Sequence, residues 1–285
     1  MDKKRIYSIW FLIPAIVIFT IFFLIPTLVS FYFSLTIWSF AEFRFVGFDN
    51  FVAFFTNANL STAMVNTIIF AVLTMLGKLV LGFFIAVFLT SNIRTKNYLR
   101  AIIFFPHLVS TIAVGITFRA LMHPSRGLIN QVLEFFRIGA VDWLGNVDLA
   151  LYSVILTDIW RGLGVATVIF IAGLTSIDKT YYEAASIDGA TSWQQLKHIT
   201  LPLIRPASNT VIILAFIGGL RTFDLIWAMT GGGPGFATEV MASTIYSQFA
   251  AGFWGMSTAG NVIMLVMIGV MVFPLQKFLL SKEVN

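Results

Sequence analysis

Long runs of apolar residues dominate the chain, and short polar segments separate them. A helix needs about 20 predominantly apolar residues to cross the ~30 Å hydrocarbon core of a bilayer, because each residue adds ~1.5 Å. Six runs are long enough, and each is predicted to be helical because backbone groups in lipid must pair within their own segment. The six predicted spans are residues 8–36, 63–90, 100–122, 149–175, 207–230 and 257–280.

Several of these runs contain prolines that can kink a helix, namely Pro14, Pro26, Pro106 and Pro274. Residues 6–41 carry no charge, which is far longer than the ~7–15 residues of a signal-peptide core, so we expect an uncleaved membrane anchor. The five connections are each too short to form a further domain. The sequence therefore predicts a single all-α integral membrane domain over residues 1–285.

Composition supports this interpretation and excludes other classes. Of the 285 residues, 58% are hydrophobic and only 11% are charged, whereas a soluble domain has about 25% charged residues. Such a composition excludes a disordered chain, a coiled coil and a nucleic-acid-binding domain, and it disfavours a cytosolic enzyme. The chain has no cysteine, which excludes disulfides, a Cys-ligated metal site and a thiol nucleophile.

The cations predict the orientation of the chain, because cytoplasmic loops carry an excess of Lys and Arg. With the N-terminus inside, eleven cations fall on the cytoplasmic side and three on the outer side. The inner set is Lys3, Lys4, Arg5, Arg94, Lys96, Arg100, Lys179, Lys197, Arg205, Lys277 and Lys282, and the outer set is Arg44, Arg126 and Arg137. Both termini are therefore predicted to be cytoplasmic, and the net charge of +5 needs no nucleic-acid partner.

The polar connection before the predicted fifth span, residues 176–206, is the most informative segment. Thr180 can cap a short helix beginning at the next residue, with Glu183 in its first turn where the helix dipole favours an anion. Gly189 permits a break, and a second helix is expected from about Ser192. Such a segment suits insertion into a groove on another protein, or it is a connector lying on the membrane. The residue pattern alone leaves these two interpretations open.

This segment resembles the EAA loop of the permease subunits of bacterial binding-protein-dependent ABC importers. The matching positions are Glu183, Ala184, Ala185, Gly189, Ile199, Leu201 and Pro202. Further similarity to the carbohydrate-uptake type 1 branch, in its maltose-F-like and glycerophosphate-A-like members, occurs at residues 45–51, 127–130, 172–177 and 230–234. Leu196 is a departure, because many members have Phe there.

The resemblance implies a type I ABC importer permease fold with six transmembrane helices. It implies that the loop docks on a cytoplasmic ATPase subunit through Glu183, Ala184, Ala185, Asp188, Gly189, Ile199, Leu201 and Pro202. The implied partners are a second homologous permease subunit, two ATP-binding cassette subunits, an extracytoplasmic solute-binding protein and the lipid bilayer of a bacterial or archaeal cell membrane. The chain itself is then not an enzyme and binds no cofactor, since ATP and Mg²⁺ belong to the ATPase subunits.

Sequence motifs for other chemistry are missing. Gly77-Lys78 is followed by Leu79 within a span, so it is not a phosphate-binding loop, and no other match to that motif occurs. The chain has three histidines and no zinc-protease or nucleophile-elbow motif, so we expect no metal site and no catalytic centre. The run 231–235 is predicted to be a tight turn that leaves the fifth span.

Ionisable side chains inside predicted spans are costly and suggest function. They are Lys78, Arg119, Asp158, Arg161, Arg221 and Asp224. Asp158 with Arg161 and Arg221 with Asp224 are spaced i, i+3, so each pair can neutralise on one helix face. They are either structural ion pairs or a polar patch around a translocation cavity, and for Lys78 and Arg119 we favour a structural role.

The resemblance implies sugar contacts after the third-span proline, after Trp160 and in the middle of the fifth span. Together with the intramembrane charges, this predicts a substrate path of His107, Thr111, Asp158, Trp160, Arg161, Gly162, Gly219, Arg221, Thr222 and Asp224. Two implied contact positions, Val165 and Gly219, have no polar side chain, so the contacts of the family are not reproduced there.

The sequence thus predicts the membrane-spanning subunit of an ATP-driven importer for a sugar or oligosaccharide. The alternative solute is glycerol 3-phosphate or a glycerophosphodiester, for which Arg161 and Arg221 are suitable phosphate partners. A remote alternative is an ion-coupled secondary carrier that uses Asp158 or Asp224, which leaves the EAA-like loop unexplained.

Overall fold

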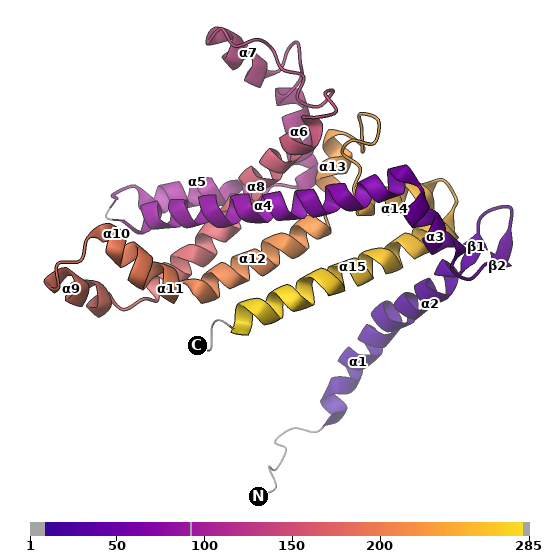
Figure 1. Cartoon of the computed structure of the whole chain (residues 1–285), viewed down its shortest axis with the longest axis horizontal. Helices are drawn as coiled ribbons and strands as arrows, with labels where there is room; N and C mark the ends of the chain where they lie inside the picture. The colour runs from indigo at the N-terminus through magenta and orange to yellow at the C-terminus, as the bar shows by residue number, and fades with distance from the viewer. Residues whose placement is uncertain (1–8, 92, 282–285) are drawn as a thin grey trace, which may run out of the picture. The chain divides into compact units, whose positions relative to one another are not determined.

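The computed structural model describes residues 9–91 and 93–281, which are almost entirely helical (Figure 1). The predicted start of the first span at residue 8 and the cations Lys3, Lys4, Arg5 and Lys282 lie outside the described residues. Among these residues, four helical runs are long and apolar enough to cross a membrane, and the number rises to as many as six if two bent helix pairs, Lys96–Leu108 with Thr111–Leu121 and Ser192–Leu203 with Arg205–Leu220, each count as one span. The four are Trp10–Ser34, Ala58–Thr90 (α4), Ala150–Thr175 (α8) and Trp254–Ser281 (α15).

The first run consists of η1 (Ile9–Leu12), α1 (Ile13–Phe19), a π-helical turn η2 (Thr20–Leu24) and α2 (Ile25–Ser34). Pro14 and Pro26 stand in the first turns of α1 and α2, where a missing N–H is tolerated. The wider turn just before Pro26 relieves the clash between the proline ring and the preceding carbonyls, so the run continues past it. The fourth proline, Pro274, lies inside α15, which also continues through it.

The third and fifth predicted spans are not continuous, which corrects the sequence prediction. The third is divided into α5 (Lys96–Leu108) and α6 (Thr111–Leu121), which are bent by 98°. The break comes three residues after Pro106, at Val109 and Ser110. The fifth begins as α12 (Arg205–Leu220), which ends ten residues before the predicted limit of 230, and α13 (Asp224–Met229) follows after a break.

The remaining elements are short connectors between these helices. They are β1 (Thr36–Trp38), β2 (Phe43–Phe45), α3 (Asp49–Thr56), α7 (Leu128–Phe135), α9 (Lys179–Ile187), α10 (Ser192–Gln195), a π-helical turn η3 (Leu196–Thr200), α11 (Leu201–Leu203) and α14 (Met241–Ala250). The described residues form two compact units. The prediction of one domain over residues 1–285 stays a prediction.

The first unit comprises the chain up to Leu60 together with residues 244–266. Its strands β1 and β2 form an antiparallel hairpin in which Thr36 pairs with Phe45 and Trp38 with Phe43. Asn50 fixes this hairpin to the end of α2, because its buried Nδ2 donates to the carbonyls of Ser34 (2.9 Å) and Thr36 (2.8 Å).

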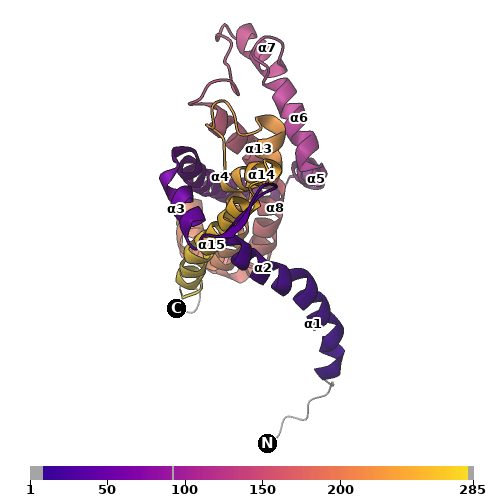
Figure 2. The ribbon, with the colours of Figure 1, turned by 90° about the vertical axis from the view of Figure 1, so that its right-hand side faces the viewer.

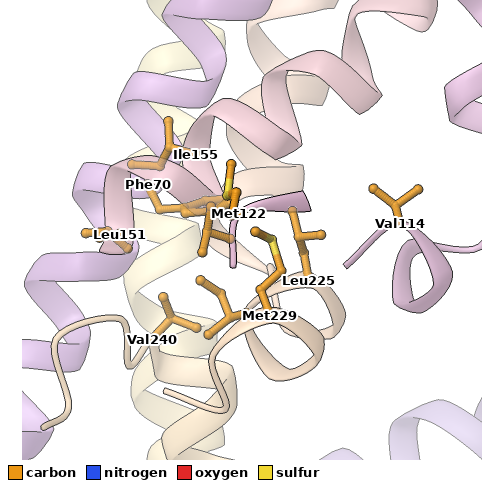
Figure 3. Close-up of a cluster of buried hydrophobic side chains, with 10 residues drawn as sticks. Phe70, Val114, Met122, Leu151, Ile155, Leu225, Met229 and Val240 are labelled. Carbon is orange, nitrogen blue, oxygen red and sulfur yellow. The ribbon is translucent and has the colours of Figure 1, made fainter. Parts of the chain in front are cut away.

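The second unit comprises residues 61–243 and the end of α15 from Met267, and it contains the features described below. A buried apolar cluster joins α4, α6, α8 and α13, and Figure 3 shows its side chains meeting from these separate helices. Its members include Phe70, Val114, Met122, Leu151, Val154, Ile155, Leu225, Ile226, Met229 and Val240. Burying such side chains stabilises the unit because apolar contacts fill the space between helices whose backbones are already satisfied.

Small residues bring several helices of this unit into close contact. A Cβ on Gly164 of α8 would lie 2.8 Å from the carbonyl oxygen of Ile103 and from the Cα of Phe104, so α5 and α8 touch at their backbones. Beyond the break at Ser110, α6 leaves the direction of α5 and carries α7 away from the other helices of the unit (Figures 1 and 2).

Candidate functional site

A cavity of about 410 Å³ lies among α4, α5, α6, α8, α12 and the segment that leads into α13. Its volume is within the range of ~300–1,000 Å³ that is typical of small-molecule sites. Eight of the ten side chains or glycines predicted for the substrate path line it. These are His107, Thr111, Asp158, Arg161, Gly162, Arg221, Thr222 and Asp224.

Two helix breaks lie beside this cavity, one before α6 and one between α12 and α13. Thr111 is the first residue of α6, and residues 221–223 separate α12 from α13. Non-helical backbone at membrane depth is tolerated only where it is buried in protein or lines a water-filled space, because lipid cannot satisfy its polar groups. The cavity therefore explains why these two helices are able to break where they do.

Lys78 of α4 and Asp158 of α8 form an ion pair in the cavity wall, with Lys78 Nζ 2.5 Å from Asp158 Oδ2. The two side chains are only 12% and 15% exposed. Gly162 makes room for this contact, because a Cβ there would collide with the aliphatic part of the Lys78 side chain. Of the two alternatives for Asp158 and Arg161, a pair within α8 is not the arrangement seen, since Asp158 is paired with Lys78 of α4.

The two arginines of the cavity lack a carboxylate partner among the described residues. Arg161 Nε is buried and makes no hydrogen bond within the part of the chain that the structure covers. Arg221 and Asp224 are both exposed. They form no ion pair with each other in the part of the chain that the structure describes. The alternative of an i, i+3 pair on one helix does not apply to them, because α12 ends at Leu220 and Arg221 and Asp224 do not share a helix.

Two predicted path residues lie elsewhere. Trp160 is 45% exposed and packs its ring against Phe118, with 5.0 Å between the ring centroids. Gly219 is buried against α4, where an added Cβ would lie 2.5 Å from the Cα of Ala71. Trp160 therefore faces away from the cavity and Gly219 serves helix packing, and neither lines the cavity wall.

Lys78 lines the cavity but is not among the residues predicted for the substrate path, although its sequence context indicates a buried ion pair. Lys78 is the only charged residue of α4, and Asp158 is the only acidic residue of α8. The single cation of α4 requires an anionic partner within the membrane, and the single carboxylate of α8 can supply one. The apolar wall from α12, which includes Val211 and Leu214, has no comparable signal.

The connection formed by residues 176–206 contains two short helices, and the first of them is α9. Asp178 caps it, accepting a hydrogen bond from the backbone N–H of Thr180 at 3.0 Å. This bond lowers the pKa of the Asp178 carboxyl, so the cap is intact above the ordinary Asp range and is lost only as the pH falls through that lowered pKa. The expectation that Thr180 caps the helix and that Glu183 lies in its first turn is wrong, because α9 begins at Lys179, two residues earlier than expected.

Gly189 ends α9 in a left-handed conformation with φ +78°. The N–H of Ala190 donates to the carbonyl of Ala185 (2.9 Å) and that of Gly189 to Ser186 (3.1 Å), which is the pattern of a Schellman cap. The break predicted at Gly189 is confirmed. The second helix begins at Ser192 as predicted, with a capping box between Thr191 and Gln194.

The two helices of this connection are tied together. The Tyr182 hydroxyl and Thr200 Oγ1 are 3.0 Å apart, and Gln195 Nε2 donates to Ser186 Oγ at 2.9 Å. A groove of about 370 Å³ lies between them, lined by Ala185, Asp188, Gly189, Ala190, Gln194, Gln195, His198 and Ile199. Leu201 and Pro202 start α11 directly after η3.

The outer face of α9 is not covered by any of the residues that the structure describes. None of its residues is buried, and Glu183, Ala184 and Asp188 are exposed, as is the side chain of Ile187 at 88%. A helix that is capped at both ends but buries nothing is arranged for contact with another molecule. The described residues contain no group of three or more His, Cys, Asp or Glu side chains that could hold a metal ion.

Comparison with known proteins agrees with this geometry. Residues 78–282 match the family described as binding-protein-dependent transport system inner membrane component. The chain is 32% identical to the trehalose/maltose transport system permease protein of Thermococcus litoralis, over 80% of this chain and 77% of that protein. It is 30% identical to the multiple sugar-binding transport system permease protein of Streptococcus mutans, over 94% of each chain.

The fold is also that of a solved structure. A chain of a bacterial ABC transporter involved in the import of the acidic polysaccharide alginate superposes with a TM-score of 0.85, over 95% of this chain and 94% of the other. The sequence identity is 23%, so this likeness concerns the fold. The predicted fold class, an all-α permease fold of the type I importers, is thereby confirmed.

Proposed function

Because the chain belongs to the binding-protein-dependent transport system inner membrane components, a family of multi-pass permease subunits, we propose that it is the membrane-spanning subunit of an ATP-driven sugar or oligosaccharide importer. An extracytoplasmic solute-binding protein delivers the solute, and the cavity at the two helix breaks forms part of its path. The sugar permeases among the relatives support this substrate class.

The observation that carries the proposal is α9, which is capped at both ends and buries none of its residues in this chain. We propose that α9 docks on a cytoplasmic ATP-binding cassette subunit through Glu183, Ala184, Ala185, Asp188 and Gly189. Ile199, Leu201 and Pro202 support it from the following turn. Movement of the ATPase then reaches α12 through η3 and α11, which are continuous with it except for the 64° bend before Arg205.

The complete assembly contains a second homologous permease, two ATPase subunits and the solute-binding protein. In this proposal the chain catalyses no reaction and binds no cofactor, and ATP with Mg²⁺ is held by the ATPase subunits. Both termini lie in the cytoplasm, as the Lys and Arg distribution predicts. ATP and the loaded binding protein act by shifting the population of outward-open and inward-open states.

The second candidate is an importer for glycerol 3-phosphate or a glycerophosphodiester. The observation in its favour is the pair of cavity arginines, Arg161 and Arg221, that have no carboxylate partner in the described part of the chain. An ion-coupled carrier is less well supported, because Asp158 is paired with Lys78 and the chain matches a family of binding-protein-dependent permeases.

Substitution at Gly189 tests the coupling role. An Asp at φ +78° is strained by about 1–2 kcal/mol and disturbs the end of α9. We expect Gly189→Asp to lower ATP-driven uptake roughly tenfold or more while the ATPase subunits stay active. The measurement is uptake and ATP hydrolysis by the assembled transporter in proteoliposomes.

Gly139→Asp is the matched control. Gly139 is also exposed with no atom near an added Cβ, but its φ is not positive, so the same substitution is unstrained. It should leave both activities unchanged. Normal uptake by the Gly189 variant would overturn the assignment of α9 as the ATPase contact.

A further inference from the structure

The charged groups of the cavity are unequally balanced. They come from four different parts of the second unit, and they are Lys78, His107, Asp158, Arg161, Arg221 and Asp224. Three are permanent cations and two are carboxylates. Because the groups are fixed in a partly enclosed space, their individual partners decide which charge remains for a solute.

Lys78 pairs with Asp158, which is the cavity carboxylate on the same helix as Arg161. Its ammonium group binds Asp158 at 2.5 Å, and both side chains are largely buried, so the pair presents little net charge to the cavity. Without Lys78, Asp158 would be the neighbour of Arg161 one turn along the same face of α8, at the i, i+3 spacing that favours an ion pair. Lys78 therefore prevents Arg161 from being neutralised within its own helix.

Arg161 is left with unused hydrogen-bonding capacity. Its Nε is buried and has no acceptor among the described residues. Arg161 is half-buried in the cavity wall, and a guanidinium group that is partly removed from water is stabilised by an anion, because its planar fork matches the oxygens of a carboxylate, sulfonate or phosphate. Asp224 does not supply that anion, because it is exposed and forms no ion pair with Arg161 or Arg221 in the part of the chain that the structure covers.

We propose that Lys78 acts as a positioning residue that holds Asp158 away from Arg161, and that Arg161, with Arg221, binds an oxyanion on the transported solute. The cavity then selects a carbohydrate or polyol derivative that bears a carboxylate, sulfonate or phosphate over a neutral sugar of the same size. This inference rests on the proposed import function and names the substrate class of the same cavity.

Direct binding measurements test the proposal. The transporter, purified with its partner subunits and placed in nanodiscs, is titrated with maltotriose, trigalacturonate and glycerol 3-phosphate, and affinity is followed by calorimetry. We expect at least one anionic probe to bind about tenfold or more tightly than maltotriose, as charge-assisted hydrogen bonds predict. Comparison of the two anionic probes tells a carboxylated sugar from a phosphorylated polyol.

Four variants separate the roles of the residues. Arg161→Gln should remove the anion preference, and Lys78→Met should reduce it similarly because the freed Asp158 pairs with Arg161. The double variant Lys78→Met/Asp158→Asn should restore the preference, although it removes two charges. Arg119→Gln is the matched control, since Arg119 is a cation of α6 that does not line this cavity.

The rescue is the decisive outcome, since a purely structural ion pair predicts no return of anion selectivity. The double variant keeps the test valid even if Lys78→Met alone does not fold. Equal binding of maltotriose and both anionic probes by the unmodified protein would overturn the inference, as would an unchanged preference in Arg161→Gln. Either result leaves the proposed function intact if ATP-driven uptake of maltotriose continues, whereas the proposed function fails if the assembled transporter imports no carbohydrate or polyol derivative.

Discussion

At the scale of single residues, glycines decide how closely the membrane helices pack. At Gly164 the backbones of α5 and α8 touch, and an added Cβ would lie 2.8 Å from two backbone atoms of α5. Backbone atoms cannot move aside as a flexible side chain does, so the helices must separate. We expect Gly164→Ala to lower the free energy of unfolding by about 1–3 kcal/mol, measured as a lower midpoint of thermal unfolding in detergent micelles.

Gly269→Ala is the matched control for this substitution. Gly269 lies in α15, and the nearest atom to an added Cβ there is 3.7 Å away on the Phe273 ring, an ordinary contact. Alanine in a helix loses less backbone entropy on folding than glycine, so stability should rise slightly, by about 0.4–1 kcal/mol. Equal shifts in both variants would show that the close approach of α5 and α8 has no energetic consequence.

The residue scale also shows where sequence reasoning stopped. The sequence identifies Asp158 and Arg161 as intramembrane charges at i, i+3 spacing, and this spacing favours a pair on one helix. The observed partner of Asp158 is Lys78, which is 80 residues away in the chain. Spacing along a helix describes only local neighbours, whereas the contact between α4 and α8 depends on packing at Gly77, Gly82 and Gly162, which the sequence alone does not reveal.

At the scale of elements, the buried side chain of Asn130 organises the connection between α6 and α8. Its Nδ2 donates to the carbonyls of Pro124 and Val141 at 2.9 Å, and its Oδ1 accepts from Val141 N–H (3.2 Å) and Trp143 Nε1 (2.9 Å). Asn130→Ala leaves these groups without their partner, at a cost of about 1–3 kcal/mol. We expect amide hydrogen exchange at Val141 to become about tenfold faster or more, measured by mass spectrometry.

The adjacent residue provides the control for that experiment. Gln131 is exposed, and its side chain makes one long hydrogen bond, from Nε2 to the carbonyl of Arg126 at 3.3 Å. Gln131→Ala should therefore leave exchange across residues 123–148 nearly unchanged. Comparable acceleration in both variants would mean that Asn130 does not hold this connection in place.

The sequence predicts that the membrane helices exist, but it does not predict where two of them are interrupted. Apolar runs of sufficient length predict α4, α8 and α15 because lipid leaves the backbone no alternative to helical pairing. The same rule fails at Val109 and at Arg221, where α5 and α12 end and the backbone N–H groups donate to carbonyls of the preceding turn, Pro106 and Ile217. The hairpin of β1 and β2 was also not predicted, since strands of three residues are too short to produce a periodic pattern.

At the scale of the whole chain, the polar features of the second unit have separate positions and separate tasks. The cavity combines groups from helices that are distant in sequence, while α9 and its groove come from one continuous connection. This difference explains why the sequence identifies the EAA-like loop almost residue by residue but only part of the cavity. A local motif is visible in a single sequence, whereas a site assembled from segments that are distant in the chain requires the fold.

The orientation of the whole chain is open to a direct test because the protein has no cysteine of its own. Single cysteines at Ser125 or Gly139 should react with a membrane-impermeant maleimide in intact spheroplasts, because both positions are exposed in the connection predicted to face outward. Cysteines at Ser192 or Ser281 should react only after permeabilisation, since the excess of Lys and Arg predicts a cytoplasmic location for these exposed positions. The unmodified protein takes no label and serves as the control, and the reverse labelling pattern would contradict the orientation on which the ATPase contact of α9 depends.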